Sequence, residues 1–388
     1  MIVYVTTQGA KIIKEGRHLL VKKDGATYHT LFTYKLQQLI ICGRVELTAS
    51  ALAFLLREQI DTVFLRFDGR YLGRLSSAES KNIFLRKKQF LLLDDQEFCL
   101  RVARQLLRGK FLNMMTVLQR IGRTRKNRAV DACILQIRNS LHNLSTAVSI
   151  DVLMGYEGSA AAAYFSGYRL GLDHDFGFTR RVRRPPTDPV NSVLSLLYTM
   201  LINRVYAAIR IAGLDPYPGV LHQSDYGRQA LPLDLVEEFR AVLADTLTLS
   251  LFNLRTLQER DFERIEQPVP LVQAPALAGD SVADLTAVLN DPVGQMNSCD
   301  AEAVFDIPSQ QTLAADETVA TENQLSIKLT PVAFRQVLSA FERKLATEFY
   351  HPLAEKRLSY AEALVFQARQ YRRVVEGEIV EYQPLLLK

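Results

Sequence analysis

The chain has 388 residues, enough for two or three domains that each bury their own core. Its hydrophobic content of 48% and charged content of 23% are ordinary for a soluble globular protein. The longest uncharged run, residues 189–203, is shorter than the ~18–20 residues that a membrane-spanning helix needs. The first residues also lack the continuous apolar stretch of a signal peptide. The composition therefore argues against a membrane protein.

The four cysteines, Cys42, Cys99, Cys133 and Cys299, stand far apart, and no two form a CxxC pair. This spacing argues against a zinc ribbon and against a disulfide scaffold. We therefore expect a cytoplasmic protein with reduced thiols.

The net charge of +5 is unevenly distributed. Residues 266–325 contain ten acids and no Lys or Arg, whereas residues 101–138 contain ten Lys or Arg and one acid. Four arginines also occupy residues 180–184. Basic clusters favour polyanion binding, because each cation placed against a phosphate releases condensed counterions. A solvated helix face is the alternative for any one cluster. The candidate DNA contacts are Arg101, Arg104, Arg108, Lys110, Arg180, Arg181, Arg183 and Arg184.

Residues 1–76 are predicted to form a small β domain. Alternating stretches such as IVYVTT, HLLVKK and QLIICG are separated by turn signals. Asp24-Gly25 and Asp68-Gly69 each lie between strand-like runs, where glycine tolerates the positive φ that a tight hairpin turn requires. One helical segment, ASALAFLLREQ, interrupts the strands.

From residue 77 onward, apolar residues recur at i, i+3 and i+4, which predicts helices. Residues 77–97 are interpreted as a helical linker and residues 98–388 as a C-terminal helical domain. Its most clearly bounded helix has Asp188 as the expected N-cap, Pro189 in the first turn and Gly213 past the end. The predicted fold class is α+β, with a small N-terminal β domain followed by a larger all-α domain.

The acidic stretch at residues 266–325 interrupts this helical domain. It has five prolines and little sustained periodicity, and a structureless stretch of this length is atypical inside a compact domain. We interpret it as an insertion or a long flexible loop, after which a helical pattern resumes in TPVAFRQVLSAFERKLATEF.

A further helix is predicted in ALPLDLVEEFRAVLAD. Asp234, Glu237 and Glu238 follow the spacing i, i+3, i+4, so their carboxylates are expected to cluster on one face, away from the apolar stripe. A solvated helix face explains this pattern without any function, and on geometry alone it is favoured. Metal binding is the alternative.

Two more residues have the chemistry of metal ligands. His222 lies in a loop before the acidic helix, and an imidazole combined with carboxylates suits Mn²⁺ or Mg²⁺. Glu157 is followed by small residues, 158–163, that permit close helix packing. A surface or packing histidine and an exposed helix acid are the simpler interpretations. Tyr164 and Tyr168 are either packing residues or stacking platforms for an unpaired base.

No competing catalytic motif is present. GxSxG, GxxxxGK[ST] and HExxH are absent, and the glycine-containing stretches do not match GxGxxG. A protein nucleophile is therefore not indicated.

The chain resembles the CRISPR-associated adaptation integrases (the Cas-one family) over nearly its whole length. Three stretches have the order and spacing found in that family: GYEGSAAAAYF, DPVNSVLSLLYTMLINRVYAAIRIAGLDPYPGVLH and GRQALPLDLVEEFR. FDGRYLGRL, RGKFLNMMTVLQR and the C-terminal stretch that begins at KLATEF are similar as well. Ala241 departs from the family, where a proline often follows EEFR, and the acidic stretch has no recognised counterpart.

In that family a glutamate, a histidine and a second acid bind a divalent metal. The resemblance implies that Glu157, His222 and Glu237 are the metal ligands and catalytic residues of this chain, with Mg²⁺ or Mn²⁺ as the cofactor. Asp234 matches a further acid near the family's site, where it would orient a ligand. The resemblance also implies an N-terminal β domain and a C-terminal helical domain.

The activity implied by the resemblance is metal-dependent strand transfer, in which the 3′-hydroxyl of a captured DNA fragment attacks the backbone at a CRISPR repeat. With water as the nucleophile, the same site would be an endonuclease. The implied partners are double-stranded DNA (fragment ends and the repeat), a second copy in a homodimer, and a small protein of the Cas-two family. A non-catalytic DNA-binding scaffold and a structural or RNA-binding protein are the alternatives.

Overall fold

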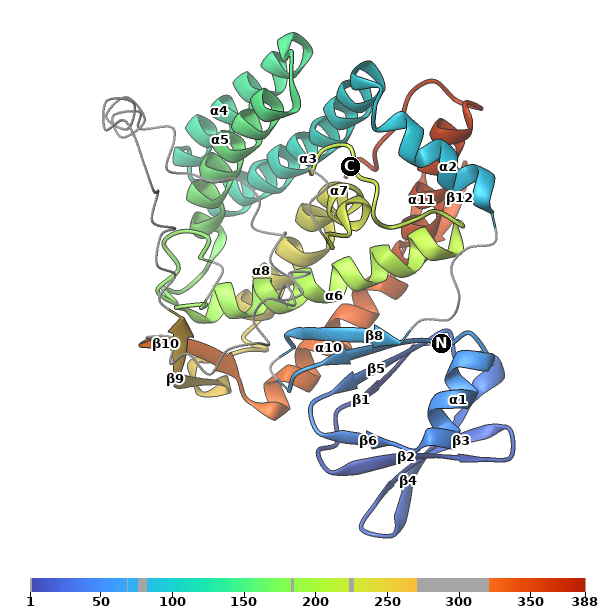
Figure 1. The fold of residues 1–388 in the computed structure, drawn as a ribbon. Helices are drawn as coiled ribbons and strands as arrows, with labels where there is room; N and C mark the ends of the chain where they lie inside the picture. Colours follow the sequence, from blue (N-terminus) through green and yellow to red (C-terminus); the bar gives the residue numbers. More distant parts are fainter. Residues whose placement is uncertain are drawn as a thin grey trace, which may run out of the picture.

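The computed structural model describes residues 2–67, 69–75, 82–182, 185–222, 227–270 and 321–387. Its N-terminal part contains two four-stranded sheets (Figure 1). One consists, in spatial order, of β1 (Ile2–Val5), β5 (Gln38–Cys42), β7 (Asp61–Leu65) and β8 (Tyr71–Leu75). The first three of these strands are parallel and the last is antiparallel. The other sheet consists of β4 (Ala26–Phe32), β3 (His18–Lys23), β2 (Ala10–Glu15) and β6 (Val45–Leu47).

The two predicted hairpins are present. Asp24 and Gly25 connect β3 to β4 with φ values of 51° and 78°, the left-handed conformation that a two-residue turn requires. Gly69, with φ of 86°, lies between the antiparallel strands β7 and β8, while Asp68 lies outside the described residues. The predicted helical segment is α1 (Ala49–Arg57), capped by the Thr48 side chain.

Strand β5 is buried along its whole length, which places its sheet between two cores. Successive side chains of a strand point to opposite faces. Leu39 and Ile41 accordingly join the small core under α1, and Ile40 and Cys42 join the large core of the helical part. The β part is therefore packed firmly against the helices.

The helical part follows, and the α+β fold class is confirmed. Its helices are α2 (Ile83–Leu92), α3 (Gln96–Arg125), α4 (Ala129–Asn143), α5 (Ile150–Tyr168), α6 (Pro189–Ile211), α7 (Ala230–Phe239), α8 (Thr246–Asn253), α10 (Pro331–Ala346) and α11 (Tyr360–Glu376). Short 3-10 helices lie at Thr33–Lys35, Leu144–Thr146, Arg169–Gly171 and Glu259–Asp261, and a π-helix lies at Arg240–Asp245.

Helix α6 is the central core helix, and its boundaries are those predicted. The Asp188 side chain accepts a hydrogen bond from the Asn191 amide at 2.8 Å, Pro189 begins the helix, and Gly213 follows its end with φ of 79°. The helix is long and apolar enough to cross a membrane by length and composition, but 83% of its most apolar window is buried inside the protein. This burial is typical of a core helix.

Two features of the C-terminal half differ from the sequence prediction. The helical pattern expected to continue to residue 349 ends at Ala346, and β11 (Glu348–His351) pairs with β12 (Lys356–Ser359), because the short EFYH and KRLS runs extend on either side of a turn. The acidic stretch is bordered by paired strands, β9 (Phe262–Pro270) and β10 (Thr321–Leu329). The rest of the stretch, residues 271–320, lies outside the described residues.

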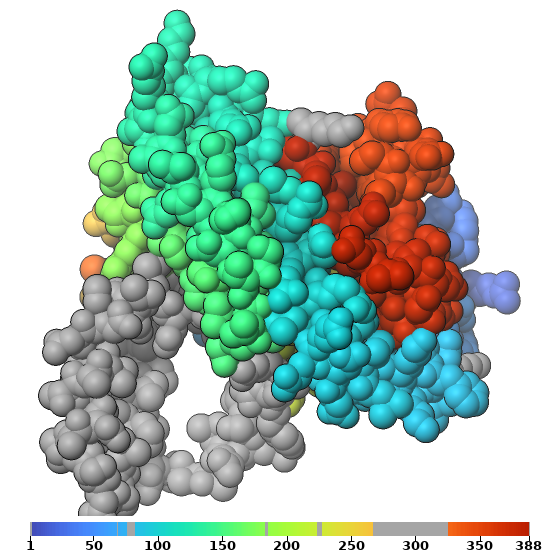
Figure 2. Space-filling model, turned by 90° about the horizontal axis from the view of Figure 1, so that it is seen from above, coloured from blue at the N-terminus to red at the C-terminus, as the bar shows by residue number. Residues whose placement is uncertain are grey.

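The chain end returns to the middle of the helical part. Figure 2 shows the C-terminal segment (red) lying against α2 and α3 (cyan), and Lys88 of α2 donates a hydrogen bond to the Glu376 carbonyl at 2.7 Å. Beyond α11, the tail crosses α3 at Gly109. A Cβ atom added there would lie 2.4 Å from the Cβ of Pro384, so only glycine allows this close approach.

We predict that Gly109→Ala lowers the free energy of unfolding by about 1–3 kcal/mol, because the tail must shift to admit the methyl group. Gly155→Ala is the matched control, since a Cβ atom at this helical glycine of α5 meets no atom within 4 Å. The control should raise stability by up to ~1 kcal/mol, the difference in helix propensity. Urea denaturation measures the free energy of unfolding of both variants. If Gly109→Ala were as stable as Gly155→Ala, the close approach of the tail to α3 would be contradicted.

Candidate functional site

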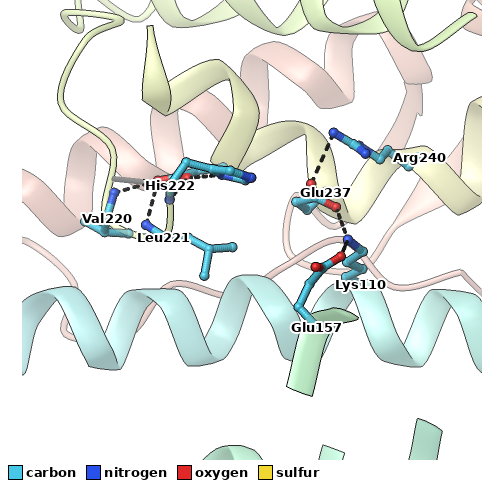
Figure 3. Close-up of polar contacts among 8 residues, drawn as sticks. Lys110, Glu157, Val220, Leu221, His222, Glu237 and Arg240 are labelled. Atoms are coloured by element: carbon cyan, nitrogen blue, oxygen red, sulfur yellow. Dashed lines mark hydrogen bonds and ion pairs between the residues drawn. The ribbon is translucent and has the colours of Figure 1, made fainter. Parts of the chain in front are cut away.

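Lys110 of α3 lies between two carboxylates that come from different helices (Figure 3). Its ammonium forms a short ion pair with Glu157 Oε1 of α5, and it lies 2.6 Å from Glu237 Oε2 of α7. All three side chains are buried. The structure therefore brings Glu157 and Glu237, which are 80 positions apart in the sequence, to one buried cation.

His222 is held at the same site by Asp234. The Nδ1 atom of His222 lies 2.7 Å from Asp234 Oδ1, and the amides of Val220, Leu221 and His222 donate to the same carboxylate at 2.6, 3.1 and 2.9 Å. A carboxylate oxygen accepts hydrogen bonds, so Nδ1 is the ring nitrogen that donates to Asp234, and Nε2 is the ring nitrogen left for the site. Figure 3 shows the His222 side chain extending from its loop toward the side of the site where Glu237 lies.

The loop before His222 contains a glycine, Gly219, at a position where a side chain would not fit. A Cβ atom at Gly219 would lie 2.6 Å from the Cβ of Ala230 and 2.9 Å from Asp234 Oδ2. The backbone therefore passes close to the start of α7, and this places three successive amides within reach of the Asp234 carboxylate.

Arg240 supplies a second positive charge at the site. Its Nη2 atom lies 3.2 Å from Glu237 Oε1. Burial alone would raise the pKa of Glu237, but Arg240, Lys110 and His222 outweigh it and lower the pKa to about 2. Glu237 is therefore ionised at neutral pH, as a metal ligand must be.

Arg240 begins a π-helix that ends at Asp245, and π-helical turns inside α-helices are often found at functional sites. Asp245 accepts hydrogen bonds from the hydroxyls of Tyr164 and Tyr198 at 2.8 and 2.7 Å, and its carbonyl accepts one from Tyr168 at 2.9 Å. Burial raises the pKa of Asp245 to about 6, although the tyrosine hydrogen bonds oppose this shift. This network fixes the segment that carries Arg240.

Two sequence interpretations of the acidic helix are corrected here. Helix α7 has no solvated face, because all of its residues are buried. Its three acids also do not cluster: Asp234 binds His222, Glu237 binds Lys110 and Arg240, and Glu238 turns toward the chain end. Burial raises the pKa of Glu238 to about 7, and its carboxylate accepts hydrogen bonds from Tyr382, Gln367 and the Leu385 amide.

Tyr164 and Tyr168 are packing residues, and the structure contradicts their possible role in base stacking. Both are fully buried, with hydroxyls bound to Asp245. A base can reach neither ring unless the core opens, so the packing alternative replaces the stacking one.

The candidate DNA contacts differ in their surroundings. Arg108 and Arg180 are exposed, and Arg101 is half-buried. Arg104 donates to the Ala147 carbonyl at 2.7 Å, and Arg181 donates to Asn191 and Ser195, so these two guanidinium groups support neighbouring segments. Arg183 and Arg184 lie outside the described residues. Lys110 is not on the surface at all: it is 7% exposed, because its ammonium is enclosed by Glu157 and Glu237.

The residues of the site fit a divalent metal by their chemistry. Two carboxylates and one imidazole nitrogen form a donor set suited to Mn²⁺ or Mg²⁺. Glu237 Oε2 is buried and, despite its closeness to Lys110, lacks an aligned hydrogen bond. Within the described part of the chain, however, no three His, Cys, Asp or Glu side chains are gathered closely enough to hold a metal ion. Lys110 occupies the space between the two carboxylates.

Comparisons with known proteins agree on one family. A family model described as CRISPR associated protein Cas1 matches residues 3–275. The CRISPR-associated endonuclease Cas1 3 of Thermus thermophilus is 31% identical over 389 residues, which cover 100% of this chain and 97% of that protein. A Cas4 exonuclease/Cas1 endonuclease fusion of Geobacter sulfurreducens is 28% identical over 98% of this chain, which spans 59% of the fusion.

Two solved structures share the fold. A CAS1 protein from Thermotoga maritima has a TM-score of 0.73 at 20% identity, with each chain covered completely. A casposase bound to its integration product has a TM-score of 0.75 at 18% identity, with 98% of this chain and 92% of that chain covered. At these identities the likeness establishes the fold only.

Proposed function

Because the chain belongs to the Cas1 family of CRISPR-associated proteins, we propose that it is a metal-dependent DNA endonuclease and integrase that inserts captured fragments at a CRISPR repeat. Its curated relatives are named Cas1 endonucleases, and a casposase with its integration product shares the fold. The observation that carries the proposal is the convergence of Glu157 and Glu237 on one buried cation, beside an imidazole that binds Asp234 through Nδ1 and so leaves Nε2 for the site.

Glu157, His222 and Glu237 are the residues that would hold Mg²⁺ or Mn²⁺. A divalent ion bound there supplies Lewis acidity at a phosphate and stabilises charge on the attacking or leaving oxygen. Asp234 binds the Nδ1 side of the His222 ring, so that Nε2 is the nitrogen that would bind the metal. Arg240 compensates part of the negative charge of Glu237 and keeps this carboxylate ionised.

The nucleophile belongs to the DNA. The 3′-hydroxyl of the fragment forms a new bond to phosphorus at the edge of the repeat, and the bond from that phosphorus to the repeat's own 3′-oxygen breaks. One phosphodiester replaces another, so no protein nucleophile is required. With water in place of the hydroxyl, the same exchange is hydrolysis, which is the endonuclease reaction.

We further propose that two copies of the chain act together with a small Cas2 protein on double-stranded DNA in the cytoplasm. A Cas6-RT-Cas1–Cas2 complex has a chain of the same fold, with a TM-score of 0.76 and 22% identity, although this chain spans only 36% of that one. This likeness supports the proposed Cas2 partner.

The decisive experiment is strand transfer from a labelled DNA fragment into a repeat-containing duplex. We expect products with Mn²⁺ or Mg²⁺ and none after chelation with EDTA. DNA binding without products in either condition would favour a non-catalytic scaffold. Preferential binding of RNA, again without products, would favour the alternative of an RNA-binding protein.

Arginines of the basic clusters that are exposed or half-buried are expected to hold DNA phosphates. We predict that replacing Arg101, Arg108 and Arg180 by alanine weakens binding to all DNA sequences alike. A plot of log affinity against log salt concentration has a negative slope, and this slope should become shallower by about one unit for each lost contact. Arg57→Ala, an exposed arginine of α1 outside these clusters, is the control and should leave the slope unchanged. An unchanged slope in the triple variant would remove the clusters from the interface.

A further inference from the structure

Lys110 is the one part of the site that the proposed metal chemistry does not use. Its side chain is buried, and its ammonium pairs with both carboxylates that would hold the metal. Lys110 belongs to α3, Glu157 to α5 and Glu237 to α7, so the ion pairs of one ammonium group link three helices.

Charge balance explains why a cation is needed there. Two carboxylates held together in a buried site repel each other strongly, since the interior screens charge far less than water does. Among the residues that the structure describes, Arg240 has its ion pair with Glu237, through the other oxygen, Oε1. Glu157 has Lys110 as its ion-pair partner among the described residues. Without the ammonium, the pair of carboxylates would hold an uncompensated buried charge.

A divalent metal and the ammonium compete for the same oxygens. Glu157 Oε1 and Glu237 Oε2 both face Lys110, and the space between them is filled by its Nζ atom. A lysine ammonium can also move away from its carboxylate partners, because it lies at the end of a flexible four-carbon chain. The guanidinium group of Arg240, in contrast, is planar and rigid.

We propose that Lys110 is a positioning residue that acts as a resident counter-ion: it holds Glu157 and Glu237 together in the metal-free protein and is displaced when the metal binds. This inference rests on the proposed metal site. It predicts that the lysine stabilises the metal-free fold and, by competition, weakens metal binding.

Lys110→Met tests this, since methionine keeps most of the length of lysine without its charge. The metal-free variant should unfold at a lower temperature than the wild type. At pH 8, Mn²⁺ should bind about tenfold more tightly or better in calorimetric titration, because no cation has to be displaced. Merely structural damage would move the affinity in the opposite direction. Lys87→Met, at an exposed position on α2, removes the same charge and should change neither quantity.

An affinity that is unchanged or weaker in folded Lys110→Met would overturn the inference. If this variant does not fold, acetic anhydride labelling of the wild type decides the question. The reactivity of Lys110, measured by peptide mass spectrometry relative to Lys87, should rise when Mn²⁺ saturates the site. Unchanged protection with Mn²⁺ bound would overturn the inference while leaving the metal site intact. A wild type that binds no Mn²⁺ would overturn the proposed metal site, and the inference with it.

Discussion

Strand transfer is expected to fall by at least about a thousandfold when Glu157 or Glu237 is replaced by glutamine or His222 by alanine, because ligands of one metal act as a unit. Glutamine keeps the shape of each glutamate, so the helices around Lys110 should stay packed. DNA binding should survive in all three variants, since phosphate contacts elsewhere supply most of the affinity. Double variants should be scarcely worse than single ones, which would distinguish a shared metal from three independent contributions.

Glu238→Gln is the matched control for these losses. It removes a buried carboxylate from the position next to Glu237, but this carboxylate binds Tyr382 and the chain end instead of the site. Its strand transfer should stay within a few-fold of the wild type. Metal-dependent activity near the wild-type level in His222→Ala would contradict the assignment, and His222 would then be a packing residue of its loop.

The fold was largely predictable because its signals are local. The turn at Asp24-Gly25 needs positive φ, and the helix that begins at Asp188 carries its own cap. Prediction failed where short segments owe their structure to a distant partner. The run Glu348–His351 is too short to be distinguished from the end of a helix, and it becomes a strand only because Lys356–Ser359 pairs with it.

The candidate site was predictable only in part, because burial depends on contacts between distant segments. The spacing of Asp234, Glu237 and Glu238 is correct for one helix face, but each acid binds a different neighbour of α7. These neighbours are the His222 loop for Asp234, α3 for Glu237, and α11 with the chain end for Glu238. Lys110 did have a local signal. It continues the buried stripe of Leu106, Leu107 and Met114 at helical spacing, so a charged residue stands where an apolar one is expected.

Asp234→Asn is expected to have the other large effect, this time on stability as well as activity. The Asp234 carboxylate is fully buried, and four hydrogens point at it: three from backbone amides and one from the His222 ring. An asparagine amide offers only one oxygen. If the oxygen faces Val220 and Leu221, the NH₂ group meets His222; in the opposite orientation, two buried amides lose their acceptor. The free energy of unfolding should fall by about 2–4 kcal/mol, since each buried donor without a partner costs ~1–3 kcal/mol.

The same substitution should weaken Mn²⁺ binding by about 10–100-fold, the usual effect of removing a group that orients a metal ligand. The physical reason is the position of one proton. An NH₂ group beside Nδ1 favours the tautomer in which Nε2 carries the hydrogen, and a protonated Nε2 cannot donate to a metal. Asp188→Ala is the control for stability alone, because it removes the buried cap of α6 at a cost of about 1 kcal/mol and does not touch His222. If Asp234→Asn lost stability but bound Mn²⁺ as tightly as the wild type, Asp234 would serve only to hold the loop, and the tautomer of His222 would not matter to the site.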